Sequence, residues 1–264
     1  ARTVSLMHAV LHGALKQAVK VGLVARNVSE ATSPPRSAKK EIRVLSHEEQ
    51  DRLLSVLGKH RLGPAILLGL ATGLRRGEIL ALRWQDVDLS KGLIYVTRGL
   101  VELYDPAKKK GSRTYLAFQD VKSAAGKRVV PIPEEIIPVL RTHKARQAEE
   151  KLFMGAEYQD NRLVFATEHG TPVHPRFLHR VFAKLLQEAG LDHVGLHALR
   201  HTFATRLLEA NEHPKVVQEI LGHSQISLTL DTYSHVGLDL KRKAVAKLNG
   251  MLRLKEESTA GSKT

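Results

Sequence analysis

Apolar residues recur three and four positions apart over long stretches of the chain, and this helical spacing begins with the first residues. Ser46 precedes one such stretch and Glu49 follows three positions later, which is the pattern of a capping box for a helix running to Leu57. Pro133 and the two glutamates after it are typical of a helical first turn. The remaining spacing predicts helices at about 63–83, 174–189, 196–210, 214–221 and 237–253.

Residues 86–132 have the shorter pattern of β-strands. We expect strands at 93–96, 114–121 and 128–132, with exposed turns at 108–111 and 123–126. The strands are few and close together in sequence, whereas helices account for most of the chain. The predicted class is therefore mainly α with a small antiparallel β-sheet (α+β).

A stretch rich in proline and positive charge separates the first predicted helix from the rest. Residues 27–43 contain the Ser33-Pro34-Pro35 triplet and several basic residues, which indicates a stiff, solvated linker. The helix before it cannot bury its own apolar stripe. We therefore expect a further domain before this segment that this chain lacks.

Charge and composition restrict the class of partner. The 264 residues include 41 Lys and Arg against 27 Asp and Glu, a difference of +14, which favours a polyanion such as nucleic acid. Cysteine is absent, so thiol catalysis, disulfides and Cys-bearing metal sites are excluded. No apolar run reaches the roughly 18 residues of a membrane span. We expect a cytoplasmic protein that acts on the nucleoid of a bacterial host and has no membrane partner.

Four short segments carry residues suited to phosphate chemistry. They are TGLRRGE at 72–78, VKS at 121–123 followed by KRVVP at 127–131, HALR at 197–200, and LGH at 221–223 with Tyr233 ten residues on. Each is weak alone, but together and in this order they resemble the tyrosine recombinases, the phage integrase family, from about Ser46 to Lys247. The resemblance implies that family's catalytic-domain fold over 39–255. It makes 1–38 the last helix of a core-binding domain plus linker, and 256–264 a flexible tail.

Cutting and rejoining DNA through a covalent intermediate needs a nucleophile, positive charge around the phosphorus, and a proton donor for the leaving oxygen. The resemblance assigns the nucleophile to Tyr233, the only tyrosine after HALR. It assigns the phosphate clamp to Arg75 and Arg200, because a planar guanidinium donates two hydrogen bonds to phosphate oxygens. Arg76 is the neighbouring alternative. Glu78 orients Arg75, or else forms only a surface ion pair with it.

The other catalytic assignments concern one lysine and two histidines. The resemblance places the general acid, Lys122, on a hairpin turn, with Lys127 as the alternative. His197 lies three positions before Arg200 on one helical face and would accept a proton near the tyrosine. His223 would hydrogen-bond a phosphate oxygen, or else be only a favourable charge at a helix end. The basic residues expected to contact DNA are Arg36, Lys39, Lys40, Arg43, Lys127 and Arg128.

Rival functions predict different outcomes. His197 and His201 have a spacing that can hold zinc, but an arginine lies between them and the glutamate of a His-Glu-x-x-His motif is absent. A non-enzymatic or architectural DNA-binding protein fits the charge equally well and predicts no covalent adduct. A type IB topoisomerase would share the clamp but only relax DNA. An Xer-type resolvase is a further alternative. The ten-residue count from His223 to Tyr233 favours integration or excision of phage or mobile-element DNA.

The resemblance also implies an assembly. Four protomers would bind two synapsed double-stranded DNAs, and strand exchange between these DNAs would form a Holliday junction. Without DNA, the chain would be a monomer. Neither a metal nor a nucleotide cofactor is expected, because arginines supply the charge. The basic helix predicted at 237–253 either packs on its own domain or docks on a neighbouring protomer.

Overall fold

The computed structural model describes residues 2–35, 43–107, 113–121 and 126–223. The chain divides into two units, Ala1–Glu41 and Ile42–Thr264. Within the part that is described, no helix has both the length and the apolar character needed to cross a bilayer.

The first unit consists of helix α1 (Arg2–Lys20) and the short 3-10 helix η1 (Val28–Ala31), which pack on each other. His12 anchors this contact, because its Nδ1 lies 3.0 Å from the hydroxyl of Ser29 and 3.2 Å from the side-chain amide of Asn27. The predicted apolar stripe of α1 is present but largely exposed, for example at Leu6 and Val10.

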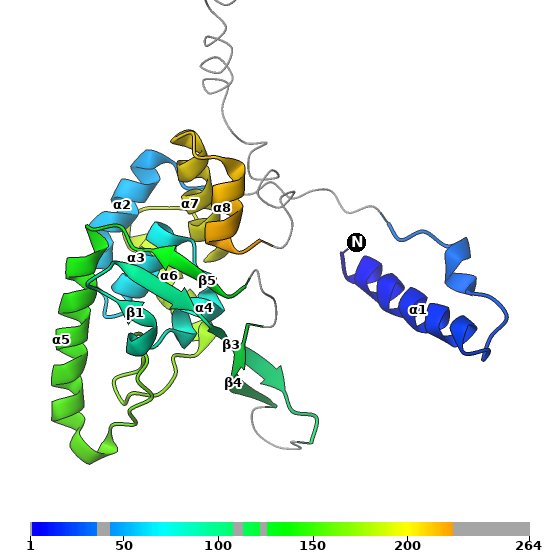
Figure 1. The fold of residues 1–264 in the computed structure, drawn as a ribbon, viewed down its shortest axis with the longest axis horizontal. Coiled ribbons are helices and arrows are strands. Elements are labelled where there is room, and N and C mark those ends of the chain that lie inside the picture. Colours follow the sequence, from blue (N-terminus) through cyan, green and yellow to red (C-terminus); the bar gives the residue numbers. More distant parts are fainter. Residues whose placement is uncertain (1, 36–42, 108–112, 122–125, 224–264) are drawn as a thin grey trace, which may run out of the picture. The chain divides into compact units, whose positions relative to one another are not determined.

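Most of the second unit is helical, as Figure 1 shows. Its helices are α2 (His47–Leu57), α3 (Gly63–Thr72), α4 (Arg76–Ala81), α5 (Ile136–Met154), α6 (Pro175–Glu188), α7 (His197–Glu209) and α8 (Pro214–Leu221), with 3-10 turns η2 (Trp84–Asp86) and η3 (Gly155–Glu157). The capping box predicted for α2 is confirmed, since the Ser46 amide donates to Glu49 Oε2 at 2.8 Å and the Glu49 amide donates to Ser46 Oγ at 3.2 Å.

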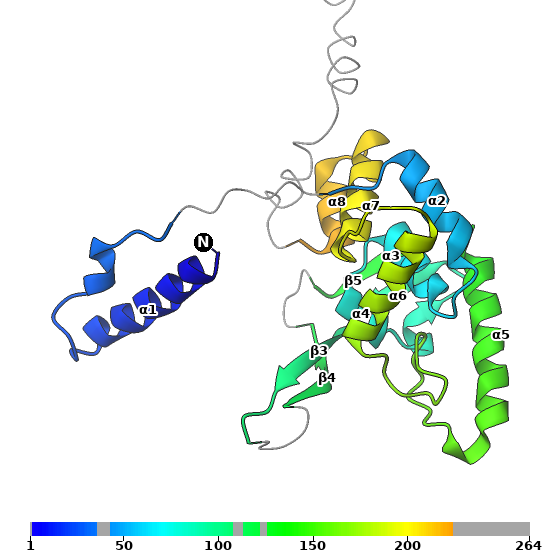
Figure 2. The same ribbon diagram turned by 180° about the vertical axis from the view of Figure 1, so that it is seen from behind.

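The strands form two small antiparallel sheets instead of the single one expected. The strands are β1 (Val87–Asp88), β2 (Leu93–Val96), β3 (Arg98–Tyr104), β4 (Thr114–Asp120) and β5 (Arg128–Pro131). The first sheet has the order β1-β2-β5, with Ile94 opposite Val130, and the second pairs β3 with β4. Figure 2 shows the β3–β4 hairpin projecting from the helical body. Strand β3 was not predicted. Its side chains are mostly half-buried, so buried and exposed positions do not alternate along it as they do in a typical strand.

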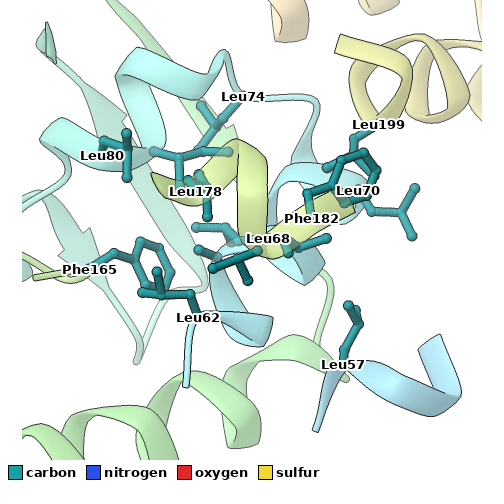
Figure 3. Close-up of a cluster of buried hydrophobic side chains, with 14 of the residues drawn as sticks. Leu57, Leu62, Leu68, Leu70, Leu74, Leu80, Phe165, Leu178, Phe182 and Leu199 are labelled. Atoms are coloured by element: carbon teal, nitrogen blue, oxygen red, sulfur yellow. The ribbon is translucent and has the colours of Figure 1, made fainter. Parts of the chain in front are cut away.

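The core lies around α3, whose side chains are apolar on nearly every side. Ala65, Ile66 and Leu68 are fully buried, and α3 packs against α2, α5 and α7. Figure 3 shows Leu68 of α3 beside Phe182 of α6 within one cluster. Burying such a Leu or Phe side chain stabilises the fold by about 1.5–3 kcal/mol. This core fixes the ends of α3, α6 and α7, and the candidate site lies at these ends.

The helix expected over about 63–83 is interrupted, and this expectation was wrong. Gly73 adopts the left-handed conformation with φ +63°, and a Cβ there would lie 2.5 Å from a ring carbon of Phe203. The chain turns at this glycine and restarts as α4, where Glu78 Oε2 accepts a hydrogen bond from the Arg75 amide at 2.8 Å. The break places Arg75 at a helix start instead of on a helix face.

Candidate active site

Arg75 and Arg200 come from distant segments and hold the same stretch of backbone. Arg200, in the first turn of α7, is 3% exposed and donates to the carbonyls of Gly73 and Leu221, each at 2.7 Å. Arg75 donates to the carbonyl of Gly222 at 2.8 Å. Because Leu221 and Gly222 are consecutive, their carbonyls bring the two guanidiniums together at the end of α8.

One pocket joins the two arginines with His197. Its lining includes Arg75, Arg200 and His197, as well as Arg76 and His179. Among the described residues that line it there is no acidic side chain. A pocket with this lining favours an anion. His197 and Arg200, three residues apart on α7, both reach it, as their helical spacing predicts.

Glu78 links Arg75 to a third arginine. Its Oε1 accepts from Arg75 Nη1 at 2.8 Å, so the predicted ion pair exists beside the pocket. Arg128, at the start of β5, donates to both oxygens of Glu78 at 3.0 and 2.8 Å. Burial alone would raise the pKa of Glu78, but the hydrogen bonds and charge of Arg128, with Arg75, lower it, so the carboxylate stays ionised.

The positive charge around the pocket has consequences for the other ionisable groups. Burial and then the neighbouring charge of Arg75 lower the pKa of Arg200 to about 9, which still leaves it protonated at neutral pH. Burial, followed by the charges of Arg200 and Arg75, lowers the pKa of His223 to about 4. Desolvation and the same two arginines lower the pKa of His197. Both histidines are therefore neutral at pH 7, so each can donate one hydrogen bond and accept another.

The low pKa of His223 predicts a pH-dependent stability. Between pH 6.5, its ordinary pKa, and about 4, the unfolded chain binds a proton that the folded chain does not. We therefore expect the free energy of unfolding to fall as the pH drops through this window, with His223 accounting for about 1–2 kcal/mol after solvent screening. Urea denaturation at a series of pH values measures it. His223→Gln should flatten the slope and His169→Gln, at an exposed position, should not. Equal slopes in the two variants would contradict this origin.

The other predicted site residues are distributed unevenly. Lys127 is exposed immediately before β5, and Arg43 is exposed and paired with Glu49. Arg128 was expected to contact DNA, but the structure differs from this prediction. Its side chain is only 6% exposed and is bound to Glu78. The rings of His197 and His201 meet edge to face at 4.7 Å. The positions outside the described residues are Tyr233, Lys122, Arg36, Lys39, Lys40 and the helix predicted at 237–253.

The sequence analysis missed one basic residue of the pocket, His179, and gave another, Arg76, only as an alternative. His179 lies on α6, outside every motif in the sequence. Its ring meets the ring of His193 edge to face, with the ring centroids 5.6 Å apart. Arg76 was considered only as a substitute for Arg75, yet both line the pocket. Only the packing of α6 against α4 could reveal the contribution of His179.

The chain is similar to known proteins over most of its length. The model of the phage integrase family matches residues 43–238. A tyrosine recombinase XerC-like protein of Caldanaerobacter subterraneus subsp. tengcongensis is 35% identical over 260 residues, covering 95% of this chain and 66% of that protein. The chain spans about two thirds of the length of the curated relatives it matches.

Solved structures give the same fold. The Tn1549 transposon integrase in complex with transposon right end DNA has a TM-score of 0.74 at 23% identity, covering 94% of this chain and 79% of that one. XerA recombinase has a TM-score of 0.58 at 26% identity, covering 81% and 66%. With the family model matching more than half of its length, the chain belongs to the phage integrase family of tyrosine recombinases.

Proposed function

We propose that this chain carries the cutting and rejoining centre of a site-specific DNA recombinase that integrates or excises mobile DNA. The observation that carries the proposal is the convergence of Arg75, Arg200 and His197 on one pocket. The relatives' names, tyrosine recombinase and integrase, support the same activity.

The clamp retains donors for a phosphate. A guanidinium has five N–H groups. The bonds described above use two of them on Arg75 and two on Arg200. The remaining donors can bind the non-bridging oxygens of a phosphodiester that enters the pocket. Their charge would stabilise the pentacovalent phosphorane without a metal ion.

The proposed reaction has two balanced steps. The Tyr233 oxygen attacks the scissile phosphorus, its proton passes to neutral His197, and the bond to the 5′ oxygen breaks. Lys122, or Lys127, protonates that oxygen, and a 3′-phosphotyrosine forms. A 5′ hydroxyl from the partner duplex then attacks the phosphotyrosine and gives its proton to the lysine, while the bond from phosphorus to the Tyr233 oxygen breaks and His197 returns a proton to that oxygen. His223 would donate a hydrogen bond to a phosphate oxygen throughout.

The partner in this proposal is double-stranded DNA, bound by four protomers on two synapsed duplexes. The DNA complex of the Tn1549 integrase supports a DNA partner through a shared fold. Named relatives include both Xer recombinases and integrases, so resolution of chromosome dimers is the second candidate. The helix predicted at 237–253 would dock on a neighbouring protomer in this assembly.

Nicked DNA that carries the target site tests the proposal. After cleavage, the short fragment between the scissile phosphate and the nick diffuses away, so the DNA cannot be rejoined. The labelled strand then stays attached to the protein on a denaturing gel. The proposal predicts this adduct, and strand exchange between two intact sites. DNA binding without an adduct would instead indicate an architectural protein. Relaxation of supercoiled DNA without exchange would indicate a topoisomerase.

A further inference from the structure

We infer that Arg128 is a positioning residue for the phosphate clamp: it fixes Glu78 and the end of α8 so that Arg75 faces the scissile phosphate. This inference rests on the proposed function. In the sequence, Arg128 belongs to the KRVVP segment and was expected only to contact DNA, so this role comes from the contacts that the structure shows.

The contacts of Arg128 are those of a buried cross-link. Its Nε donates to the carbonyl of Ile220 at 2.6 Å, and its two terminal nitrogens bind both oxygens of Glu78. One of them also lies 3.3 Å from the carbonyl of the buried Gly126. A lysine offers a single point charge and could not reproduce this fork.

Three arginines hold three consecutive carbonyls at the end of α8. Ile220 accepts from Arg128, Leu221 from Arg200, and Gly222 from Arg75. The last carbonyls of a helix lack partners within it and carry the negative end of its dipole, so they attract cations. Arg128 is the member of this trio that does not line the pocket, which suits it to a supporting role.

Glu78 explains how Arg128 would act on Arg75. Both carboxylate oxygens are engaged by Arg128, and only Oε1 also binds the Arg75 guanidinium. Without Arg128, a buried carboxylate would be left with Arg75 as its remaining guanidinium partner. We expect Glu78 then to bind Arg75 with both oxygens and draw it away from the phosphate.

A competing role can be separated by chemistry. Gly126 also ties Arg128 to the end of the segment that carries Lys122, so Arg128 could instead position the general acid. A substrate with sulfur replacing the 5′ bridging oxygen distinguishes the two roles, because a thiolate is a much weaker base than an alkoxide and leaves without a proton donor. A variant with a defective clamp should form the adduct slowly on this substrate too. A variant with a defective general acid should form it at the wild-type rate.

The experiment measures single-turnover adduct formation on nicked DNA with oxygen or sulfur at the scissile position. We expect Arg128→Lys and Arg128→Met each to slow adduct formation by about 10–100-fold on both substrates, since the clamp loses its geometry. Arg141→Lys and Arg141→Met, at an exposed position on α5, should match the wild type. If Arg128→Met does not fold, Arg128→Lys carries the test, with thermal melting and DNA affinity as checks.

A double mutant tests the route through Glu78. If Arg128 acts through this carboxylate, Arg128→Lys should cost much less in a Glu78→Gln background than in the wild type. Wild-type rates in Arg128→Lys, rescue by sulfur, or full additivity with Glu78→Gln would each overturn the inference. Absence of an adduct in the wild-type chain would instead count against the proposed function.

Discussion

Tyr233→Phe is expected to abolish covalent attachment to nicked DNA while leaving DNA affinity unchanged. The substitution removes one oxygen, which is the atom that would bond to phosphorus, and no other group in the proposed mechanism can take its place. The phosphate ligands Arg75 and Arg200 remain, so binding persists. A labelled nicked duplex, analysed on denaturing and native gels, measures both quantities in one preparation.

Tyr95→Phe is the matched control for the nucleophile. Tyr95 lies on β2, is 40% exposed, and is not among the residues that line the pocket of Arg75 and Arg200. This variant should form the adduct at the wild-type rate. A covalent adduct in Tyr233→Phe would show that another residue is the nucleophile.

Arg200→Ala is expected to slow adduct formation by about 10²–10³-fold, the usual effect of removing one donor to the developing charge. Arg200→Lys should recover little of the rate, because an ammonium lacks the planar fork. Both variants should also lower the melting temperature, since Arg200 holds the carbonyls of Gly73 and Leu221 in the fold. Single-turnover cleavage and thermal melting measure the two effects separately.

A second arginine on the same helix separates catalysis from stability. Arg206 also cross-links the fold, because it donates to the carbonyl of Leu45 at 2.7 Å and pairs with Glu209 at 2.8 Å, but it does not line the pocket. Arg206→Ala should therefore lower the melting temperature with far less effect on the cleavage rate. Equal rate losses in Arg200→Ala and Arg206→Ala would assign Arg200 a purely structural role.

Several elements could be predicted because their determinants are local. The capping box at Ser46 depends on side chains three residues apart, and it is present as expected. Helix α6 begins at Pro175 and has one apolar face, so spacing alone located it to within a residue. The pairing of His197 and Arg200 on one side of α7 follows from the helical repeat.

Other features depend on contacts that spacing does not encode. Gly73 ends α3 in the left-handed conformation, and Phe203 and Leu221, more than a hundred residues away, leave no room for a Cβ there. Arg128 looked like a surface residue, since the sequence does not show that Glu78 and the end of α8 enclose it. The convergence of Arg75 with Arg200 was expected only through the family resemblance.

A structure of the Tyr233→Phe variant bound to its uncut DNA site tests most directly whether two distant arginines share one phosphate. We predict that the guanidiniums of Arg75 and Arg200 both lie within hydrogen-bonding distance, about 2.7–3.2 Å, of non-bridging oxygens on the same phosphate, with residue 233 behind it and opposite the 5′ oxygen. Guanidiniums bound to different phosphates, or a DNA path that misses the pocket of Arg75, Arg200 and His197, would contradict the mechanism.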